Sequence, residues 1–303
     1  MSGSIFDFLC IGSITLDLNT VAGRSIRAIG GSAYYTSLIL ARLGCRVALV
    51  SRVGRELKHV EEKLNSAGVY VAKLDVLDCK PIQFENIYDS SGRRVQRVSC
   101  ELPPITVEDL PDIEARCIHI CPTIGDVDVS VVEWASERSF TSIDIQGFLR
   151  EADEQRVVKL TYSSGAMKAV RLSNFVKADL DEARCLTGEK TAAEAACALA
   201  GDRRIGAVTM GAEGSVICWR KPMRIPAYRA RRVVDPTGAG DAYAAGFLYS
   251  LVYRGASIAE SGHVASAVAS FLVEDWGASC SFTWKEVERR IRGNYDKTLL
   301  RTR

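Results

Sequence analysis

The segment VVDPTGAGDAYAAGF, from Val233 to Phe247, decides how this chain is interpreted. Its two valines indicate the end of a strand, a turn with Pro and Gly follows, and small residues from 242 to about 253 predict a helix. A helix N-terminus has unpaired backbone N–H groups and the positive end of the helix dipole, so it favours an anion. The segment therefore predicts an anion-binding turn made by the amides of Gly238, Ala239 and Gly240.

Asp241 follows this turn directly. A carboxylate at a helix N-terminus is most often a cap, which is the structural alternative here. The glycines favour a functional interpretation, because Gly238 and Gly240 permit positive φ and let a ligand approach the backbone closely. A base beside an anion hole suits a hydroxyl that loses its proton while a phosphoryl group arrives. We therefore predict that Asp241 is a catalytic base.

The composition is that of an ordinary soluble protein. The 303 residues are 47% hydrophobic and 25% charged, with a formal net charge of +2. The N-terminal apolar stretch is interrupted by Asp7 and Asp17, which indicates a first strand rather than a signal peptide. No apolar run approaches the ~18 residues of a membrane span. We expect a cytoplasmic protein that does not bind membranes.

A cluster of basic residues precedes the decisive segment. Its members are Arg220, Lys221, Arg224, Arg229, Arg231 and Arg232. The cluster lies in strand-like, turn-rich sequence without interleaved aromatic residues, and the overall charge is near zero. We interpret it as a solvated edge, or as local steering of an anionic nucleotide, and expect no nucleic-acid binding.

The chain has ten cysteines but no CxxC pair, and only three histidines, so zinc is poorly supported. Most of the cysteines lie in apolar runs, and buried small hydrophobic side chains are the default interpretation.

Strand and helix patterns alternate along the chain, which predicts an α/β fold with a mostly parallel sheet covered on both faces. Strands are expected at 6–14, 45–54, 117–124, 140–148 and 172–176, with a strand, turn and strand at 205–219. Helices are expected at 30–44, 59–69, 129–139, 153–160, 181–188, 192–200, 242–253 and 263–279. The alternating residues of 82–100, around Ser90–Gly92, predict an antiparallel hairpin.

The motif Asp-Pro-Thr-Gly-Ala-Gly-Asp before a small-residue helix resembles the C-terminal signature of the ribokinase-like (PfkB) family of carbohydrate kinases. Five further stretches match in order, so the resemblance covers nearly the whole chain. It implies one α/β/α sandwich domain over residues 1–303, with a mostly parallel central sheet and lid elements around 15–29 and 80–102. The interval from Asp17 to Gly30 is too short for the usual lid strands, so we expect a reduced lid. An exposed lid strand is also where a homodimer would pair.

The resemblance assigns several residues to the acceptor. Asp17 matches the acid that accepts hydrogen bonds from sugar hydroxyls; a turn cap is its alternative. Gly30 and Gly31 match the paired glycines beside the substrate. Where many sugar kinases have an Asn, this chain has Tyr35, which argues against a ribokinase or fructokinase. The short lid and the sequence GGSAYY resemble the inositol-kinase-like and archaeal branches, which favours a cyclitol.

Two further stretches resemble phosphate and metal positions of the family. In IDIQGFLR, the resemblance places Gln146 near the acceptor, and Arg150 is expected to bind phosphate in a bidentate way, through two of its guanidinium nitrogens. A surface helix arginine is the alternative. In KADLDEARCLTG, Asp179 and Glu182 match the residues that hold Mg2+ through water, with Asp in place of Asn. An acidic helix start is the alternative for this pair.

The remaining matches concern the nucleotide and a monovalent cation. VTMGAEG resembles the nucleotide loop, with Thr209 and Gly211 near phosphates and ribose and Gly214 in the turn; alone it is only a hairpin signal. His263 matches an adenine contact, with packing or capping as the alternative. By the same resemblance Asp235 and Thr237 are expected to lie at a monovalent cation site that takes K+, completed by Ser279 and Ser281.

These features together predict a phosphotransferase that uses ATP and Mg2+ to phosphorylate a hydroxyl of a small sugar or cyclitol, with a myo-inositol-like acceptor favoured. A nucleoside kinase of the same family is the first alternative. A non-catalytic nucleotide-binding protein is a second one, although Asp241 and Glu182 are both present. A dinucleotide-dependent dehydrogenase is disfavoured, because the first strand–helix turn, IGSITLD, has one glycine.

Overall fold

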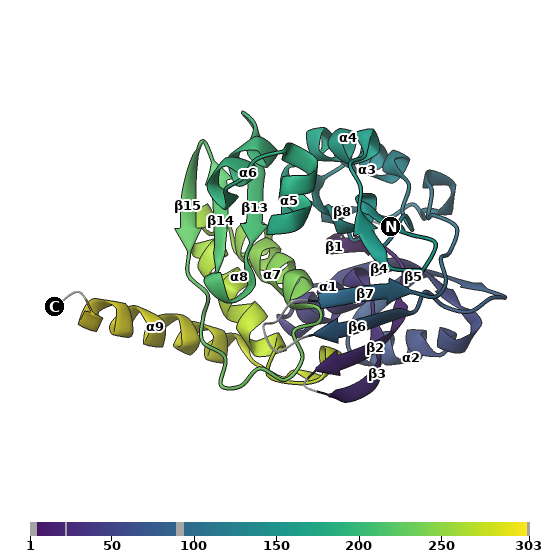
Figure 1. The fold of residues 1–303 in the computed structure, drawn as a ribbon, viewed down its shortest axis with the longest axis horizontal. Helices are drawn as coiled ribbons and strands as arrows, with labels where there is room; N and C mark the ends of the chain where they lie inside the picture. Colours follow the sequence, from purple (N-terminus) through teal and green to yellow (C-terminus); the bar gives the residue numbers. More distant parts are fainter. Residues whose placement is uncertain (1–4, 22, 89–93, 302–303) are drawn as a thin grey trace.

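The computed structural model describes residues 5–21, 23–88 and 94–301. Within these ranges a nine-stranded sheet forms the centre, in the order β15-β14-β13-β12-β9-β8-β1-β4-β5 (Figure 1). Neighbouring strands from β5 to β13 run parallel, and β14 and β15 extend the sheet with antiparallel pairs. The strands are β1 (Phe6–Ile11), β4 (Val47–Gly54), β5 (Val69–Leu77), β8 (Ala115–Ile120), β9 (Phe140–Asp144), β12 (Phe175–Asp179), β13 (Ile205–Thr209), β14 (Ser215–Trp219) and β15 (Lys221–Ile225).

Helices cover both faces of this sheet, which confirms the predicted sandwich. One face packs against α1 (Ser32–Arg42), α2 (Val60–Ser66), α7 (Ala239–Leu248), α8 (Ile258–Leu272) and the start of α9 (Trp284–Arg301). The other packs against α3 (Val129–Ser136), α4 (Ser164–Leu172), α5 (Leu180–Thr187) and α6 (Ala192–Ala200). In β1 the consecutive residues Phe8 and Leu9 face opposite helix layers, and both are fully buried. Because both faces are covered, the strand is apolar throughout.

A second sheet forms the lid, in the order β3-β2-β6-β7. Its strands are β2 (Thr15–Val21), β3 (Arg24–Gly30), β6 (Phe84–Tyr88) and β7 (Arg94–Val98). The expectation that the interval from Asp17 to Gly30 is too short for lid strands was wrong. The strands β2 and β3 pair over their full length, down to Val21 opposite Arg24, so a very short connection suffices. The strands of the predicted hairpin at 82–100 are confirmed, and its turn at Ser90–Gly92 lies outside the described residues.

The helix expected at 153–160 is absent from the structure of that segment. An antiparallel pair, β10 (Arg150–Ala152) and β11 (Val158–Leu160), occupies it instead. Its turn is fixed by Asp153, whose Oδ1 accepts hydrogen bonds from two turn amides, and by Arg156 at a φ of 62°. Local turn chemistry therefore overrides the helical spacing. The helix of this region, α4, begins later, after the cap Ser163.

The valines that open the decisive segment were also misassigned. No strand lies between β15 and α7 in the described chain, and the Val233 residue is 68% exposed. The Val234 N–H donates to the Val273 carbonyl at the end of α8. A loop that crosses the end of α8, rather than a strand, therefore leads into the anion-binding turn.

The cysteines are mostly buried and free, as expected, with one exception. Cys197 of α6 and Cys218 of β14 form a disulfide, which the default interpretation had not assigned. The bond ties a helix to the outer part of the sheet. The pair is 21 residues apart in the sequence and has no short-motif signal.

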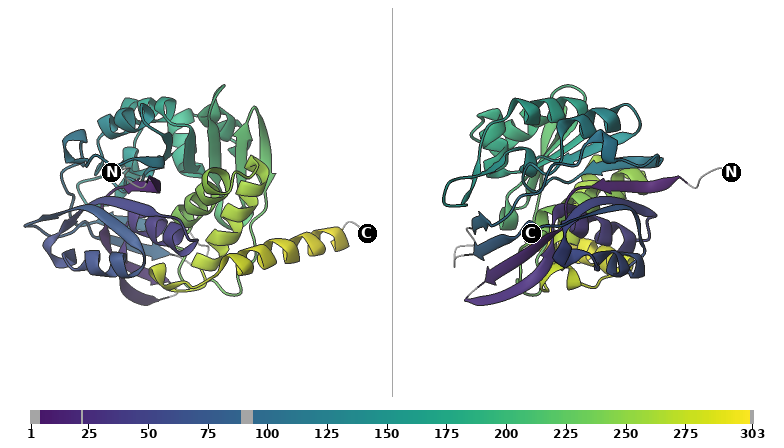
Figure 2. Two further views of the ribbon diagram at one scale, coloured as in Figure 1. Left: turned by 180° about the vertical axis from the view of Figure 1, so that it is seen from behind. Right: turned by 90° about the vertical axis from the view of Figure 1, so that its right-hand side faces the viewer.

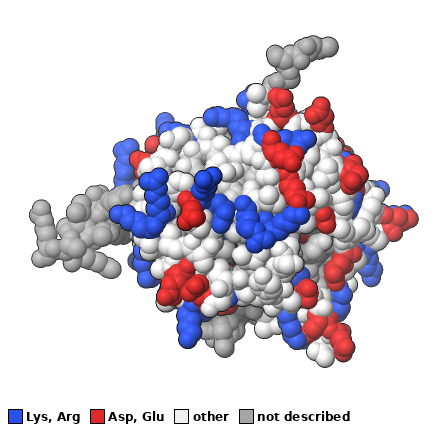
Figure 3. Space-filling model, turned by 90° about the horizontal axis from the view of Figure 1, so that it is seen from above, with Lys and Arg blue, Asp and Glu red and all other residues white. Residues whose placement is uncertain are grey.

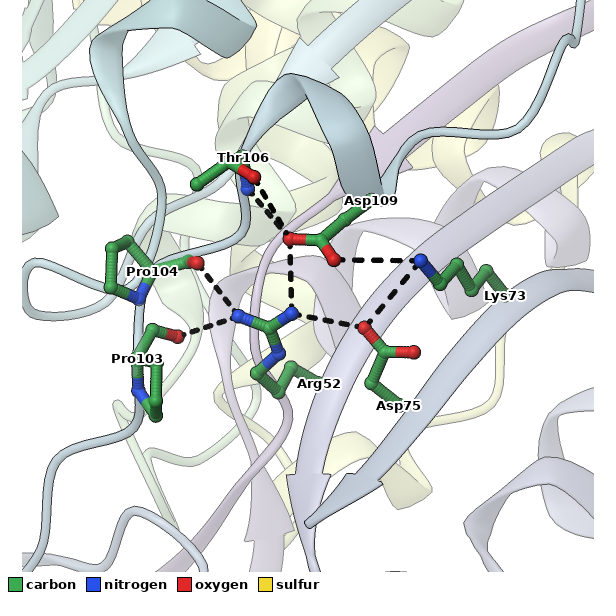
Figure 4. A network of polar contacts seen from close by, with 7 residues as sticks. All are labelled: Arg52, Lys73, Asp75, Pro103, Pro104, Thr106 and Asp109. Atoms are coloured by element: carbon green, nitrogen blue, oxygen red, sulfur yellow. Dashed lines mark hydrogen bonds and ion pairs between the residues drawn. The ribbon is translucent and has the colours of Figure 1, made fainter.

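A network of charges around the buried Arg52 anchors the chain where it returns from the lid to the sheet (Figure 4). Arg52 of β4 donates from Nη1 to the carbonyls of Pro103 and Pro104, at 2.9 and 2.7 Å. Its Nη2 lies 3.0 Å from carboxylate oxygens of both Asp75 and Asp109. One guanidinium therefore joins two sheet strands to the connection between β7 and β8.

Charges of both signs cover the face shown in Figure 3, where basic side chains form a band with acidic ones on both sides. Helix α9 extends away from the rest of the fold in the left view of Figure 2, as it does in Figure 1. None of the helices in the described chain has the length and apolarity that a membrane span requires.

Candidate functional site

A cavity of about 870 Å³ lies between the lid, the carboxyl ends of β9, β12 and β13, and the start of α7. This is where ligands bind in open parallel sheets. The predicted site residues that line it are Asp17, Gly31, Tyr35, Gln146, Arg150, Asp179, Glu182, Thr209, Gly211, Thr237, Gly238, Ala239, Gly240 and Asp241. Four others, namely Gly30, Gly214, Asp235 and His263, do not line it. The fold therefore gathers residues from most of the chain at one site.

The predicted glycine turn forms at the start of α7, where the Ala239 N–H donates to the Pro236 carbonyl, and anion binding at this turn stays a prediction. Gly238 is the N-cap residue at a φ of 82°, a conformation that favours glycine. A Cβ atom added there would lie 2.8 Å from the ring of Tyr35, so the position also lacks room for a side chain. The rings of Phe247 and Phe175 stack with centroids 4.3 Å apart, and this contact seats α7 on β12.

Asp241 lies in the first turn of α7 with an exposed fraction of 8%. Its Oδ1 accepts a hydrogen bond of 2.5 Å from the Ser32 hydroxyl, which comes from the start of α1. Burial, followed by the nearby Asp144 carboxylate, raises the pKa of Asp241 to about 6, although Lys177 and the Ser32 bond act in the opposite direction. A carboxylate with a pKa near 6 is ionised at neutral pH and can still accept a proton.

Lys177 is a site residue that the sequence interpretation missed. Its ammonium group is buried in β12, lies 2.7 Å from Asp144 Oδ2, and lines the cavity. A Cβ atom added at Gly240 would be 2.7 Å from Lys177 Nζ, so this cation lies against the anion-binding turn. Burial by itself lowers the pKa of Lys177, but the carboxylates of Asp144, Glu182 and Asp241 raise it above its ordinary value. A lysine within the apolar run FVKAD was the available signal.

Arg150 is buried in β10 and does not lie on a surface helix. Its Nη2 lies 3.1 Å from Glu182 Oε1, and its Nη1 is 3.5 Å from the Thr123 carbonyl. The guanidinium is thus held at the cavity wall by Glu182. Two cations, Arg150 and Lys177, therefore lie in the site beside the acids.

Asp179 and Glu182 form a capping box at the start of α5, in which each side chain accepts the other residue's backbone N–H. Burial, and then the Glu182 charge, raises the pKa of Asp179 to about 6. Nearby, Asp144 Oδ1 is buried and has no hydrogen-bond partner in the described chain. Burial raises the pKa of Asp144 despite its ion pair with Lys177. Carboxylate oxygens with unused bonding capacity are suitable for Mg2+ that keeps several waters.

Asp17, which was predicted to bind the acceptor, lies in the lid. It is inside β2, and its Oδ1 accepts a 2.7 Å hydrogen bond from the Thr15 hydroxyl. Gly30 is required beside it, because an added Cβ would overlap the Asp17 carboxylate at 2.1 Å. Gly31 has a φ of 98°. Gly30 thus lets the backbone lie close to the Asp17 carboxylate, and the predicted approach of a substrate to these glycines stays a prediction.

Tyr35 is fully buried next to the turn, and its hydroxyl has no hydrogen-bond partner in the part of the chain that the structure describes. Burial, and then the charges of Asp17, Asp235 and Asp241, raises the pKa of this phenol well above its usual value. The ring therefore forms a neutral, close-fitting wall of the cavity beside the turn at Gly238.

His263, which was predicted to contact adenine, does not line the cavity. It is half-buried on α8, and the distance from its Nδ1 to the Tyr228 hydroxyl is 2.9 Å, which agrees with the packing alternative. Gly214 has a φ of 91° and turns the chain between β13 and β14. An added Cβ there would lie 2.2 Å from the Ile225 carbonyl. Both residues therefore have structural contacts that explain them.

Asp235 is buried behind the turn. Its Oδ1 accepts a hydrogen bond from Thr237 N, and its Oδ2 accepts from Gly277 N and from Asn19 Nδ2. The Ser279 hydroxyl donates to the Trp276 carbonyl. The Asp235 carboxylate thus already has three donors, and the monovalent cation site remains a prediction.

Comparison with known proteins identifies the fold and the chemistry. The model of the pfkB family carbohydrate kinase matches residues 8–285. The chain belongs to this family. It is therefore a kinase, a phosphotransferase with a small-molecule acceptor, and the cavity is its candidate active site.

Relatives of this kinase differ in acceptor. It is 25% identical over 322 residues to a nucleoside kinase of Methanocaldococcus jannaschii, covering 96% of this chain and 98% of the relative. It is 27% identical over 283 residues to an inositol 3-kinase of Arabidopsis thaliana, covering 89% and 74%. A solved structure of a pyrophosphate-dependent kinase in the ribokinase family has a TM-score of 0.79 at 25% identity, covering 89% of this kinase and 96% of that chain.

Proposed function

We propose that this kinase transfers the terminal phosphoryl group of ATP to a hydroxyl of a small polyol, with a cyclitol of the myo-inositol type favoured. The observation that carries the proposal is the buried Asp241 carboxylate, with a pKa of about 6, at the start of a helix whose first residues line the cavity. A base and an anion hole within one turn can deprotonate a hydroxyl and bind the incoming phosphoryl oxygens together.

Each residue has a distinct part in this mechanism. Asp241 orients the acceptor hydroxyl and takes its proton as the oxygen attacks phosphorus. The amides of Gly238, Gly240 and Asp241 and the ammonium group of Lys177 stabilise the charge of the phosphoryl group in transfer, whereas the Ala239 N–H donates to the Pro236 carbonyl. Arg150, held by Glu182, adds a second positive charge at the same wall. Catalysis is then mostly positioning and electrostatic stabilisation.

A divalent cation fits the balance of charges. Four carboxylates of the site, those of Asp144, Asp179, Glu182 and Asp241, are accompanied by two basic groups. Asp179 and Glu182 would hold Mg2+ through water, and the ion would supply charge neutralisation for the donor phosphates.

The acceptor is inferred from the lid side of the cavity. Its polar groups there are Thr15, Asp17, Asn86, Gln96 and Gln146. This set of groups includes both hydrogen-bond donors and acceptors. It therefore suits a compound with several hydroxyls.

A nucleoside is the second candidate acceptor. Phe84, Val158 and Leu160 form an apolar part of the cavity lining that suits the face of a nucleobase. The relative from Methanocaldococcus jannaschii supports the same acceptor. Its ribose would present a hydroxyl to Asp241 in the same way.

An acceptor and donor screen tests the proposal. Purified kinase with Mg2+ is given myo-inositol, common hexoses, ribose, cytidine and inosine, each with ATP and separately with pyrophosphate. The phosphorylated product is measured by mass spectrometry. We expect ATP-dependent phosphorylation of myo-inositol or a close cyclitol. A product only from a nucleoside would replace the acceptor, a product only with pyrophosphate would replace the donor, and no product from any pair would contradict the proposal.

A further inference from the structure

A row of buried amide side chains runs from the lid to the loop before the anion-binding turn. Gln96 Nε2 of β7 donates to Asn86 Oδ1 of β6 at 2.8 Å. Asn86 Nδ2 donates to Asn19 Oδ1 of β2 at 2.9 Å, and Asn19 Nδ2 donates to Asp235 Oδ2 at 3.1 Å. The three amides are directly opposite one another in the register of the lid strands. They therefore lie side by side on one face of the lid.

The carboxylate at the inner end sets the direction of every bond in the row. Asp235 can only accept, so Asn19 must present its N–H group to it and its carbonyl oxygen to Asn86. The same reasoning turns the amide of Asn86 and then that of Gln96. All four residues have an exposed fraction of 9% or less, and Asn19 and Asp235 at the inner end have 0% and 1%, so water does not compete for the bond between these two. The row has one favourable arrangement.

The two ends of the row lie at functionally different places. At the inner end, the Asp235 carboxylate also holds Thr237 N, one residue before the N-cap Gly238. At the outer end, Gln96 and Asn86 line the cavity, whereas Asn19 is fully buried behind it. A second bond, 3.1 Å between the hydroxyls of Tyr88 and Thr237, ties β6 to the same loop.

We propose that this row couples acceptor recognition to the geometry of the anion-binding turn: Gln96 binds a hydroxyl of the acceptor, and Asn19 positions the turn through Asp235. The inference rests on the proposed function and deepens it, because it requires an acceptor with a hydroxyl remote from the one that is phosphorylated. The Gln96 amide keeps its carbonyl oxygen and one N–H outside the row, so it can both accept from and donate to such a hydroxyl. Asn19 touches no substrate and is a positioning residue.

Two nearly isosteric substitutions break the row at opposite ends. In Asn19→Asp a second carboxylate meets Asp235, and in Gln96→Glu a carboxylate meets Asn86 Oδ1. The carboxyl group introduced by either substitution can replace all hydrogen bonds of the lost amide within the row only when it is protonated. A carboxylic acid then donates from one oxygen and accepts at the other. The titratable side chains around the inner end, besides Asp235, include Asp17, Tyr35 and Tyr88.

The test measures kcat and the acceptor KM of these variants and of wild type at several pH values between 5.5 and 8. The substrates are ATP and myo-inositol, or ATP and cytidine if the acceptor screen selects a nucleoside. At pH 8 we expect Asn19→Asp to lower kcat by roughly 30-fold and Gln96→Glu to raise the acceptor KM by about 10-fold, since each leaves a buried polar group without its bond. Both deficits relative to wild type should shrink at least threefold at pH 5.5. The control Glu85→Gln changes the neighbouring, half-exposed residue of β6 and should stay within twofold of wild type.

Deficits that do not change with pH, or that appear only as a loss of folded protein, would overturn the coupling. A measurement without turnover separates this result from failure of the proposed function. Urea unfolding of Asn19→Asp, Gln96→Glu and the double variant gives a double-mutant cycle. Asn19 and Gln96 do not bond to each other, so separate sites would show additive losses, whereas one connected row gives a double loss clearly smaller than the sum. Additive losses would contradict the row even if no acceptor were phosphorylated.

Discussion

Two clusters of charge lie at the central sheet and differ in burial and in charge balance: the cluster around Arg52 is partly exposed, whereas the cluster around Lys177 is buried. In the cluster around Arg52, the guanidinium lies 3.0 Å from both Asp75 and Asp109, and Lys73 lies near the same two acids. None of these residues lines the cavity. Despite its partial burial, the pKa of Asp109 is lowered by the Thr106 backbone bond and by Arg52. The charges in this cluster neutralise one another within the protein.

The cluster around Lys177 lies at the cavity of the candidate site and is not neutral. Burial raises the pKa of Asp144, Asp179 and Asp241 in it, and one oxygen of Asp144 has no hydrogen-bond partner in the described part of the chain. A buried charge without full compensation costs free energy, so it is expected where function requires it. The difference between the clusters predicts that one supports mainly stability and the other mainly catalysis.

The largest effect is expected at the base. Asp241→Asn removes the proton acceptor but keeps the shape and the Ser32 contact, so kcat should fall by about 10³- to 10⁴-fold. ATP affinity, measured by calorimetry, should change less than threefold, and the midpoint of thermal unfolding should not fall, because a carboxylate with a raised pKa has been replaced by a neutral amide. A variant that kept more than a tenth of wild-type kcat would contradict the role of Asp241.

A smaller effect on rate is expected at Lys177. Lys177→Met removes a positive charge from beside Gly240 and leaves the Asp144 carboxylate buried without its partner. We expect kcat to fall by about 100-fold, together with a loss of stability of about 3 kcal/mol in urea unfolding. The control Lys73→Met removes a lysine from the other cluster and should leave kcat within twofold. If both lysine variants kept full activity, the comparison between the clusters would be wrong.

The smallest effect on activity is expected at Arg52. Arg52→Met removes four contacts, leaves the Pro103 and Pro104 carbonyls without this donor, and leaves Lys73 as the remaining cation of the network for Asp75 and Asp109. The free energy of unfolding should fall by about 2–4 kcal/mol, while kcat per folded molecule stays within twofold of wild type. A large loss of kcat at unchanged stability would show that the network acts on the active site.

The sequence predicted the parts of this molecule that depend on local patterns. The alternation of strands and helices and the turn before Asp241 are both confirmed, because a period of apolar residues or a run of glycines specifies them directly. The resemblance to the family is likewise confirmed over residues 8–285.

What the sequence did not predict depends on contacts between distant segments. A turn at Asp153 lies where a helix was predicted. The disulfide of Cys197 and Cys218 joins two residues that belong to no sequence motif. Lys177 and Asn19 have partners 33 and 216 residues away, and only the folded sheet and lid bring them together. The site was therefore predictable where the residues form motifs, and not where single polar residues in strands meet.

The pH dependence of kcat/KM for the acceptor tests the central claim most directly. Asp241 must be ionised to accept the proton, and its pKa of about 6 implies that activity is lost as pH falls through that value. Because the pKa of Asp179 is also about 6, the profile is measured in wild type and in Asp179→Asn. The account predicts that kcat/KM falls about tenfold per pH unit below pH 6 in both proteins. A profile that stayed flat from pH 7.5 to 5 would contradict it.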